Sequence, residues 1–153
     1  YASVRDLELG HLPDMKSIGT EVASEYERLE NEQLHAEADE LATLGLRLGQ
    51  QMSLGDASRT LIGQLVGIAV EKEVLSVMDP ARQHAGLPLP VDQMRSELQR
   101  QNDELKDLVS GLHDVLVPLM ADSDEQRLIQ YLERFKLFGE EEALRWARRQ
   151  RGE

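Results

Sequence analysis

The feature of this sequence that most constrains its fold is a row of mainly apolar residues between positions 94 and 119. Successive members are four, three, four, three, four, three and four positions apart, so they lie along one side of a helix. The row, called the heptad seam below, consists of Met94, Leu98, Gln101, Leu105, Leu108, Leu112, Val115 and Leu119. It predicts a long helix that Pro118 kinks or ends, because a proline ring clashes with the carbonyl group four residues earlier.

Two kinds of partner would suit the heptad seam. The seam can pack against other helices of the same chain, or it can join two copies of the chain as a homodimer. Gln101 is the polar member of the seam, and a single buried polar side chain can fix the register between paired helices. The sequence leaves both arrangements open.

Apolar residues at steps of three and four also predict helices elsewhere in the chain. The first covers residues 13–52, and its middle third has so little apolar surface to bury that we expect it to be exposed or to bend the helix. The second covers residues 57–78 and is apolar on most sides, which is typical of a central, buried helix. Residues 80–90 contain three prolines and a glycine, which favours an irregular linker.

Two shorter helices are predicted at the C-terminal end. A capping box at residues 123–126 starts the first, and Gly139 suits its end. The expected fold is therefore all-α, an irregular helical bundle of four to five helices, two or three of them long. We expect a single helical domain over residues 1–153, with a long-helix body at 13–120 and a short C-terminal helix pair at 123–151.

Glycines four positions apart occur in both of the first two predicted helices, as Gly45 and Gly49 and as Gly63 and Gly67. Each costs about 1 kcal/mol of helix propensity relative to alanine, so a compensating role is expected. If the turn between the helices is centred near residue 54, Gly45 lies level with Gly63 and its neighbour. Small residues at this level would permit a close helix contact. The alternative is that these glycines are only tolerated.

Composition and charge exclude several classes of protein. The 153 residues carry a formal net charge of −12, which disfavours nucleic-acid binding, because such binding needs basic surface. The absence of cysteine excludes a disulfide scaffold and thiol catalysis. No apolar run approaches the roughly 20 residues that cross a membrane. The charge is uneven, since residues 1–52 hold eleven acids against four bases, whereas residues 123–153 hold seven of each.

The acidic first half contains the candidate interaction surface for another protein. Residues 21–40 hold eight acids and one basic residue, which is typical of a solvated helix face that can also attract a basic partner. We assign this surface to Glu21, Glu25, Glu32, His35 and Asp39. On a single helix Glu32, His35 and Asp39 share one face. Glu-x-x-His is also half of a di-iron pattern, but the second half is missing, so we expect no metal site.

The sequence contains no arrangement that indicates catalysis. Ser110, His113 and Asp114 are the residue types of a hydrolase triad, but they lie on one predicted helix, and no nucleophile elbow precedes the serine. The glycines match neither a phosphate-binding loop nor a dinucleotide fingerprint. We therefore expect no enzymatic activity and no cofactor.

One stretch of the chain resembles a known kind of helical unit. The sequences LGLRLGQQ and TLIGQLVGIA, within residues 36–78, are similar to a helical hairpin of uncharacterised exported bacterial proteins. Those hairpins resemble tetratricopeptide units, which implies a helix pair that binds peptides or partner proteins on a concave surface. Met52, Asp56 and Arg59 stand where the tetratricopeptide motif has Trp, Gly and Tyr, so no site residue is carried over.

Two classes of function fit these observations. The first is a non-enzymatic helical protein that binds another protein through its acidic helix face or its heptad seam. The alternative is a ligand-sensing helical bundle that holds a small molecule between helices near the paired glycines. The chain begins at Tyr1 without an initiator methionine, which fits a trimmed chain or a mature exported protein. Cytoplasmic and exported locations both stay open, and we slightly favour export.

Overall fold

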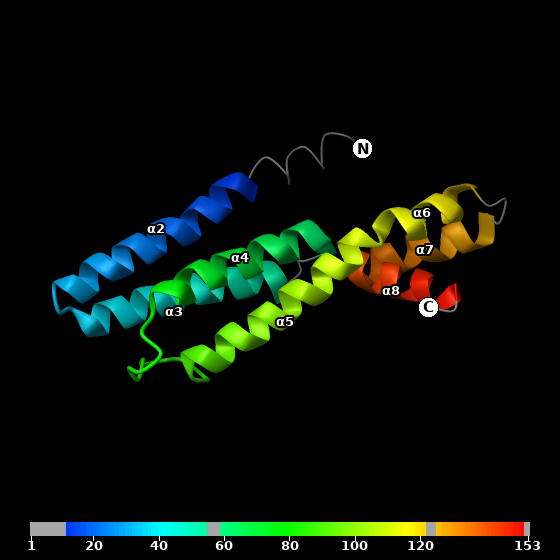
Figure 1. Cartoon of the computed structure of the whole chain (residues 1–153). Helices are drawn as coiled ribbons and strands as arrows, with labels where there is room; N and C mark the ends of the chain where they lie inside the picture. The colour runs from blue at the N-terminus through cyan, green and yellow to red at the C-terminus, as the bar shows by residue number, and fades with distance from the viewer. Residues whose placement is uncertain (1–11, 55–58, 122–124, 152–153) are drawn as a thin grey trace.

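The computed structural model of the protein describes residues 12–54, 59–121 and 125–151. These residues form seven helices and no strand (Figure 1). The helices are α2 (Leu12–Asn31), α3 (His35–Leu54), α4 (Leu61–Val77), α5 (Val91–Ser110), α6 (Leu112–Ala121), α7 (Glu125–Phe138) and α8 (Glu140–Gln150). The all-α prediction is confirmed, but the helices outnumber the four to five that we expect from the sequence, because two of the predicted long helices are each divided in two.

The first division replaces the helix predicted over residues 13–52 by the antiparallel pair α2 and α3. Gln33 adopts a left-handed conformation with φ of 62°. Its N–H donates to the carbonyl of Glu30, and the N–H of Leu34 donates to the carbonyl of Leu29. These two bonds form a Schellman motif, which satisfies the last carbonyl groups of α2 and ends the helix. The single-helix prediction is wrong because this position is normally occupied by glycine or asparagine, and neither residue is present here.

Helices α3 and α4 cross closely, at a register that differs from the predicted one. A Cβ atom on Gly67 would lie 2.5 Å from the carbonyl oxygen of Gly49, so these two glycines meet across the crossing. A Cβ on Gly45 would instead contact Val22 and Val74. The predicted pairing of Gly45 with Gly63 is wrong, since α3 continues to residue 54 and the turn is therefore centred several residues later. Gly63 is buried, and its N–H donates to the capping hydroxyl at the start of α4.

Helix α4 is the centre of the long-helix body. It packs against α3, α2 and α5, which explains why the sequence is apolar on most of its sides. Ile68, Val70, Val74 and Leu75 are buried in this core. Burial of such a side chain stabilises the fold by about 2 kcal/mol.

The second division separates α5 from α6 at Gly111, and α6 continues through Pro118. The helix end that we predict at Pro118 therefore lies seven residues earlier. The guanidinium group of Arg148 lies where a Cβ of residue 111 would stand, and its Nη2 donates to the carbonyl oxygen of Asp107 over 2.9 Å. Glycine leaves room for this cation, which adds a further hydrogen bond to a carbonyl near the end of α5 that also accepts from the Gly111 N–H.

Pro118 is accommodated inside α6 because a side chain replaces its missing hydrogen bond. Proline has no N–H to donate to the carbonyl of Asp114, one turn earlier. That carbonyl accepts a hydrogen bond from Nη1 of Arg151. The C-terminal arginines are thus used within the molecule, as the ion pairs Arg148–Asp107, Arg145–Glu141 and Arg149–Glu142 also indicate.

The heptad seam packs against helices of its own chain. Its buried members are Met94, Leu98, Leu105, Leu108 and Val115, with Leu112 and Leu119 half-buried beside them. Gln101 is only half-buried, and the buried polar residue of α5 is its neighbour Asn102. The seam therefore leaves little apolar area for a second copy of the chain, which favours the intrachain arrangement.

The helices form two groups along an elongated molecule. Helices α2 to α5 lie side by side, and α6, α7 and α8 gather at the far end of α5 (Figure 1). Helix α6 thus lies with the C-terminal helices. The connection between α4 and α5 lies at the opposite end from α7 (Figure 1). Among the described helices, none combines the length and the apolar character that crossing a membrane requires.

Candidate functional site

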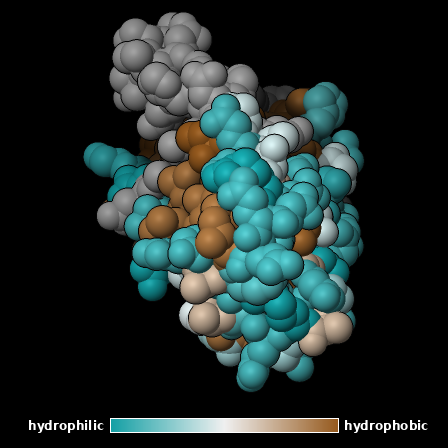
Figure 2. Space-filling model, turned by 90° about the vertical axis from the view of Figure 1, so that its left-hand side faces the viewer, coloured by the Kyte–Doolittle hydropathy of each residue, from teal (hydrophilic) through white to brown (hydrophobic). Residues whose placement is uncertain are grey.

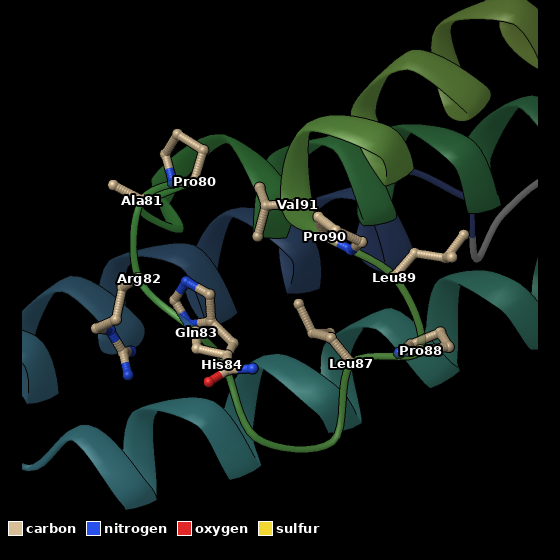
Figure 3. A pocket seen from close by; sticks show the side chains of 10 residues that line it. All are labelled: Pro80, Ala81, Arg82, Gln83, His84, Leu87, Pro88, Leu89, Pro90 and Val91. Atoms are coloured by element: carbon tan, nitrogen blue, oxygen red, sulfur yellow. The ribbon is translucent and has the colours of Figure 1, made fainter.

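The candidate site is the irregular connection between α4 and α5, residues 78–90, called the α4–α5 connection below. It contains no helix or strand, as its prolines predict. The connection folds back over the α2–α3 hairpin and sends Arg82 and His84 toward these helices (Figure 3). It is therefore fixed by side-chain contacts and not by secondary structure.

Asp39 of α3 is the centre of these contacts. Its Oδ1 atom lies 2.7 Å from Nη2 of Arg82 and 2.9 Å from Nδ1 of His84. Its Oδ2 atom accepts hydrogen bonds from Nη1 of Arg82 over 3.2 Å and from the N–H of Ala85 over 3.0 Å. Only 5% of Asp39 is exposed. A carboxylate can be buried in this way only because every part of it is paired.

His84 is held by hydrogen-bond acceptors on both sides of its ring. Nδ1 faces the Asp39 carboxylate, and Nε2 lies 2.8 Å from the carbonyl oxygen of Asp79. A neutral imidazole has only one N–H group, so both nitrogens can donate only when the ring is protonated. The geometry therefore fits the imidazolium form, and its charge is balanced by Asp39.

Arg82 links the connection to α2 as well. Its Nη2 lies 2.6 Å from Oε1 of Glu30 and 3.0 Å from the hydroxyl of Tyr26. The second oxygen of Glu30 lies 3.1 Å from Nδ1 of His35, at the start of α3. Arg82, His84, Asp39, Glu30 and Tyr26 together are called the Asp39 cluster below. This cluster joins three segments of the chain with two acids and two cationic groups.

The cluster shifts the acid–base properties of its members. Burial opposes ionisation of Asp39, but hydrogen bonds from His84 and Arg82 outweigh it and hold the pKa of this carboxyl below its ordinary value of 3.8. Burial is also the main cause of the raised pKa of the Tyr26 hydroxyl. Asp39 is thus ionised and Tyr26 neutral throughout the physiological range. The paired carboxylate of Asp39 thus keeps its charge within the cluster.

A pocket of about 410 Å³, called the connection pocket below, is lined by the same segment and the start of α5 (Figure 3). Its apolar lining consists of Pro80, Ala81, Leu87, Pro88, Leu89, Pro90 and Val91, and its polar lining consists of Arg82, Gln83 and His84. The volume falls in the range of about 300–1,000 Å³ that is typical of ligand sites. Two of the polar residues also belong to the Asp39 cluster, so the cluster determines the shape of the pocket.

The acidic surface predicted from the sequence is only partly assembled. Glu21, Glu25 and Glu32 are exposed, and His35 is exposed beside Glu30. Asp39 is buried, so its assignment to this surface is wrong. The reason is the turn after α2, which places Glu32 outside α3 and rotates Asp39 toward the connection. Figure 2 shows the end of the molecule that carries this turn, and this face is mainly hydrophilic with a hydrophobic patch on one side.

The residues considered for metal binding and catalysis do not form a site in the described part of the chain. Within it, no group of three or more His, Cys, Asp or Glu residues is placed to hold a metal ion. Ser110, His113 and Asp114 line an open pocket of about 480 Å³. The hydroxyl of Ser110 donates to the carbonyl of Asp107, and His113 lies 3.7 Å from Asp114. No hydrogen bond joins the serine to the histidine, so this trio lacks the nucleophile–base pair of a triad.

The space beside the paired glycines is smaller than the connection pocket. A cavity of about 190 Å³ lies near the α3–α4 crossing and is lined in part by Ser53, Gln64 and Ile68. That volume is below the roughly 300 Å³ at which ligand pockets begin. The paired glycines therefore serve close packing, and the connection pocket is the better candidate for binding.

Comparisons with protein-family models, curated proteins and solved structures find no match to this chain. The tetratricopeptide resemblance of residues 36–78 therefore stays a prediction. The assignment of the site depends on its geometry alone.

Sequence reasoning did not identify Arg82 and His84 as site residues. They lie in the predicted linker, where charged side chains are usually solvated. One signal was present, since Asp39 lies three positions before Ala42 and next to Ala38 on the predicted helix, and both alanines are fully buried. A carboxylate on the buried side of a helix needs a cation, and the linker supplies two.

Proposed function

We propose that the protein is a non-enzymatic helical interaction domain that binds a segment of a partner protein in the connection pocket. The observation that carries this proposal is the anchoring of the α4–α5 connection by the buried Asp39 cluster. Surface loops usually lack such anchors, and a loop held in one conformation binds a partner without the entropic cost of becoming ordered.

The lining of the connection pocket favours a peptide segment as the bound group. Leu87, Leu89 and the prolines provide apolar surface for one aliphatic anchor side chain. The N–H groups of Leu87 and Leu89 make no hydrogen bond within the described structure, so they are free to pair with the main chain of a partner. The side chain of Gln83 is exposed and supplies a further donor and acceptor.

The charge of the neighbouring hairpin favours a basic segment. Glu21 and Glu27 of α2 and Glu37 and Glu40 of α3 are exposed and form no ion pair within the described structure. Their field attracts a basic partner and increases the rate at which it reaches the pocket. The proposed ligand is therefore a basic peptide with one aliphatic anchor residue.

A selection from a random-peptide phage library against the immobilised full chain tests this function. We expect the enriched peptides to share an aliphatic residue flanked by lysine or arginine. Titration calorimetry of an enriched peptide then compares the wild type with Leu89→Ser, which removes apolar surface from the pocket. We expect the dissociation constant to rise about tenfold, which corresponds to the loss of one apolar contact.

Ile62→Ser is the matched control for this experiment. Ile62 is half exposed, as Leu89 is, but it lies at the start of α4 and does not line the connection pocket. We expect Ile62→Ser to bind the peptide as the wild type does. The proposal is refuted if no common peptide pattern is enriched, or if Leu89→Ser and Ile62→Ser bind equally well.

A further inference from the structure

Helix α7 leaves one apolar face without a partner. Tyr131 is the buried residue of this helix, whereas Ile129 is 52% exposed and Leu132 is 54% exposed. Leu128 and Phe135 are half-buried, and their spacing places them on the helix between this pair and Tyr131. Phe135 packs against the core. The apolar surface of α7 thus continues outward from the core into solvent.

The exposed face has a sequence that is complementary to itself. Glu125, Ile129, Leu132 and Lys136 are four, three and four positions apart, which places them on one face of α7. All four are exposed. The side chains of Glu125 and Lys136 form no ion pair within the described structure. The face, called the α7 stripe below, therefore has an acid at one end, a base at the other and two aliphatic residues between them.

We propose that the α7 stripe is the interface of a homodimer in which α7 pairs antiparallel with α7 of a second copy across a twofold axis. In this register Ile129 lies opposite Leu132 of the second copy, and Glu125 lies opposite its Lys136. Each contact occurs twice, as an isologous interface requires. The 4-3-4 spacing is the pattern by which paired helices interlock their apolar side chains.

The distribution of charge favours a second copy over a charged partner at this position. The whole chain carries a net charge of −12, but residues 123–153 hold seven acids and seven bases. Two copies of an acidic chain repel each other least where the local charge is zero. A basic partner, in contrast, is attracted to the acidic first half of the chain.

This dimer differs from the one that the heptad seam allows. The seam is buried against the chain's own helices, so pairing through it would require the body to open. Pairing through the α7 stripe requires no rearrangement, because its side chains are already exposed. The α7 dimer is also independent of the proposed peptide binding, since the connection pocket lies at the other end of the molecule (Figure 1).

Sedimentation velocity of the full chain over a range of concentrations tests the dimer. We expect the wild type to shift with concentration from 17.3 kDa toward twice that mass. Lys136→Glu would place like charges opposite each other at both ends of the stripe, and we expect it to raise the dimer dissociation constant about tenfold. Glu125→Lys combined with Lys136→Glu restores opposite charges, and we expect it to return the constant to near the wild-type value.

Leu132→Glu and Leu137→Glu form a matched pair on the same helix. Leu137 is 66% exposed but lies off the α7 stripe. We expect Leu132→Glu to abolish the dimer and Leu137→Glu to leave it intact, with the same helical circular dichroism for both. A wild type that stays at 17.3 kDa at every concentration, or a charge exchange that does not restore pairing, would overturn the proposal.

Discussion

Asp39 makes the contacts that hold the α4–α5 connection in place. Its carboxylate is buried and receives hydrogen bonds from Arg82, His84 and Ala85. Removing one partner of a buried ion pair leaves the other charge without compensation, which costs more than the pair contributes. The effect of a substitution at Asp39 therefore measures how firmly the connection is held.

Asp39→Asn keeps the shape of the side chain and removes its charge. We expect it to lower the free energy of unfolding by about 3 kcal/mol, because His84 and Arg82 lose the buried carboxylate that both contact, and only Arg82 keeps another acid, Glu30. Urea unfolding followed by circular dichroism measures the change. Glu37→Gln makes the same chemical change on the exposed side of α3 and should alter stability by less than about 0.5 kcal/mol. Equal effects at the two positions would mean that the cluster does not anchor the connection.

Glu71 of α4 is buried, and no cation among the described residues pairs with it. Burial at the α3–α4 crossing raises the pKa of its carboxyl to about 7, although hydrogen bonds from Ser53 and Gln50 partly offset this effect. A folded-state pKa above the unfolded value of 4.5 means that the folded protein keeps a proton that the unfolded chain releases. The contribution of Glu71 to the stability of the folded protein is therefore highest below pH 4.5. It decreases as the pH rises through about 7.

Glu71→Gln removes this pH dependence while keeping a side chain that can contact Ser53. We expect the variant to be more stable than the wild type by about 2 kcal/mol at pH 8, and the difference to disappear near pH 4.5. Chemical unfolding of both proteins at the two pH values measures it. Because all other ionisable groups are the same in the two proteins, the difference isolates Glu71. A difference that does not change with pH would show that this carboxyl ionises as freely as in water.

At the scale of the elements, the α3–α4 crossing shows what a glycine contributes to packing. A Cβ on residue 67 would lie 2.5 Å from the Gly49 carbonyl oxygen and 2.6 Å from the Ser53 nitrogen. Both are backbone atoms, which cannot move without shifting α3. At Gly45, in contrast, the atoms in the way belong to the side chains of Val22 and Val74.

Gly67→Ala should therefore be more harmful than Gly45→Ala. Alanine gains about 1 kcal/mol of helix propensity at either position. At residue 67 we expect the backbone clash to exceed this gain and to lower the melting temperature, with a net loss of about 2 kcal/mol. At residue 45 the loss should be smaller, because valine side chains can turn. Differential scanning calorimetry of the two variants ranks them, and the reverse order would contradict the observed crossing.

The helices also show which features can be predicted from sequence patterns. The heptad seam, the apolar α4 and the irregular connection are all present, because each follows from residues close together in the chain. The end of α2 could not be predicted, since Gln33 takes a left-handed conformation without the usual glycine or asparagine. At the break at Gly111, the space beside the glycine is filled by the guanidinium of Arg148, which is 37 positions later in the sequence, so this contact is visible only after folding.

At the scale of the whole molecule, the same limit explains why the candidate site was missed. Arg82 and Asp39 are 43 positions apart, and Tyr26 and His84 are 58 positions apart. No local spacing connects such residues, so composition placed Asp39 on an acidic surface when the fold buries it. The charge of −12 was predictable, but the pairing of individual charges was not.

The two proposed surfaces lie at opposite ends of the elongated molecule (Figure 1). A dimer through α7 would therefore present two connection pockets facing away from each other. If a partner carries two copies of the bound segment, both pockets can engage it, and its apparent affinity then rises without any new contact. Monomeric variants of α7 should lose this gain and keep the affinity for a single peptide.

The central claim is that the Asp39 cluster fixes the α4–α5 connection in one conformation. Hydrogen exchange of the Ala85 amide, measured by NMR, tests it most directly, because this N–H donates to the buried carboxylate of Asp39. The amide of Gln83, in the same connection, has no hydrogen-bond partner in the described structure and serves as the internal reference. We expect the Ala85 amide to exchange at least about tenfold more slowly than its intrinsic rate. We expect the Gln83 amide to exchange near its intrinsic rate. Unprotected exchange at both amides would contradict the claim.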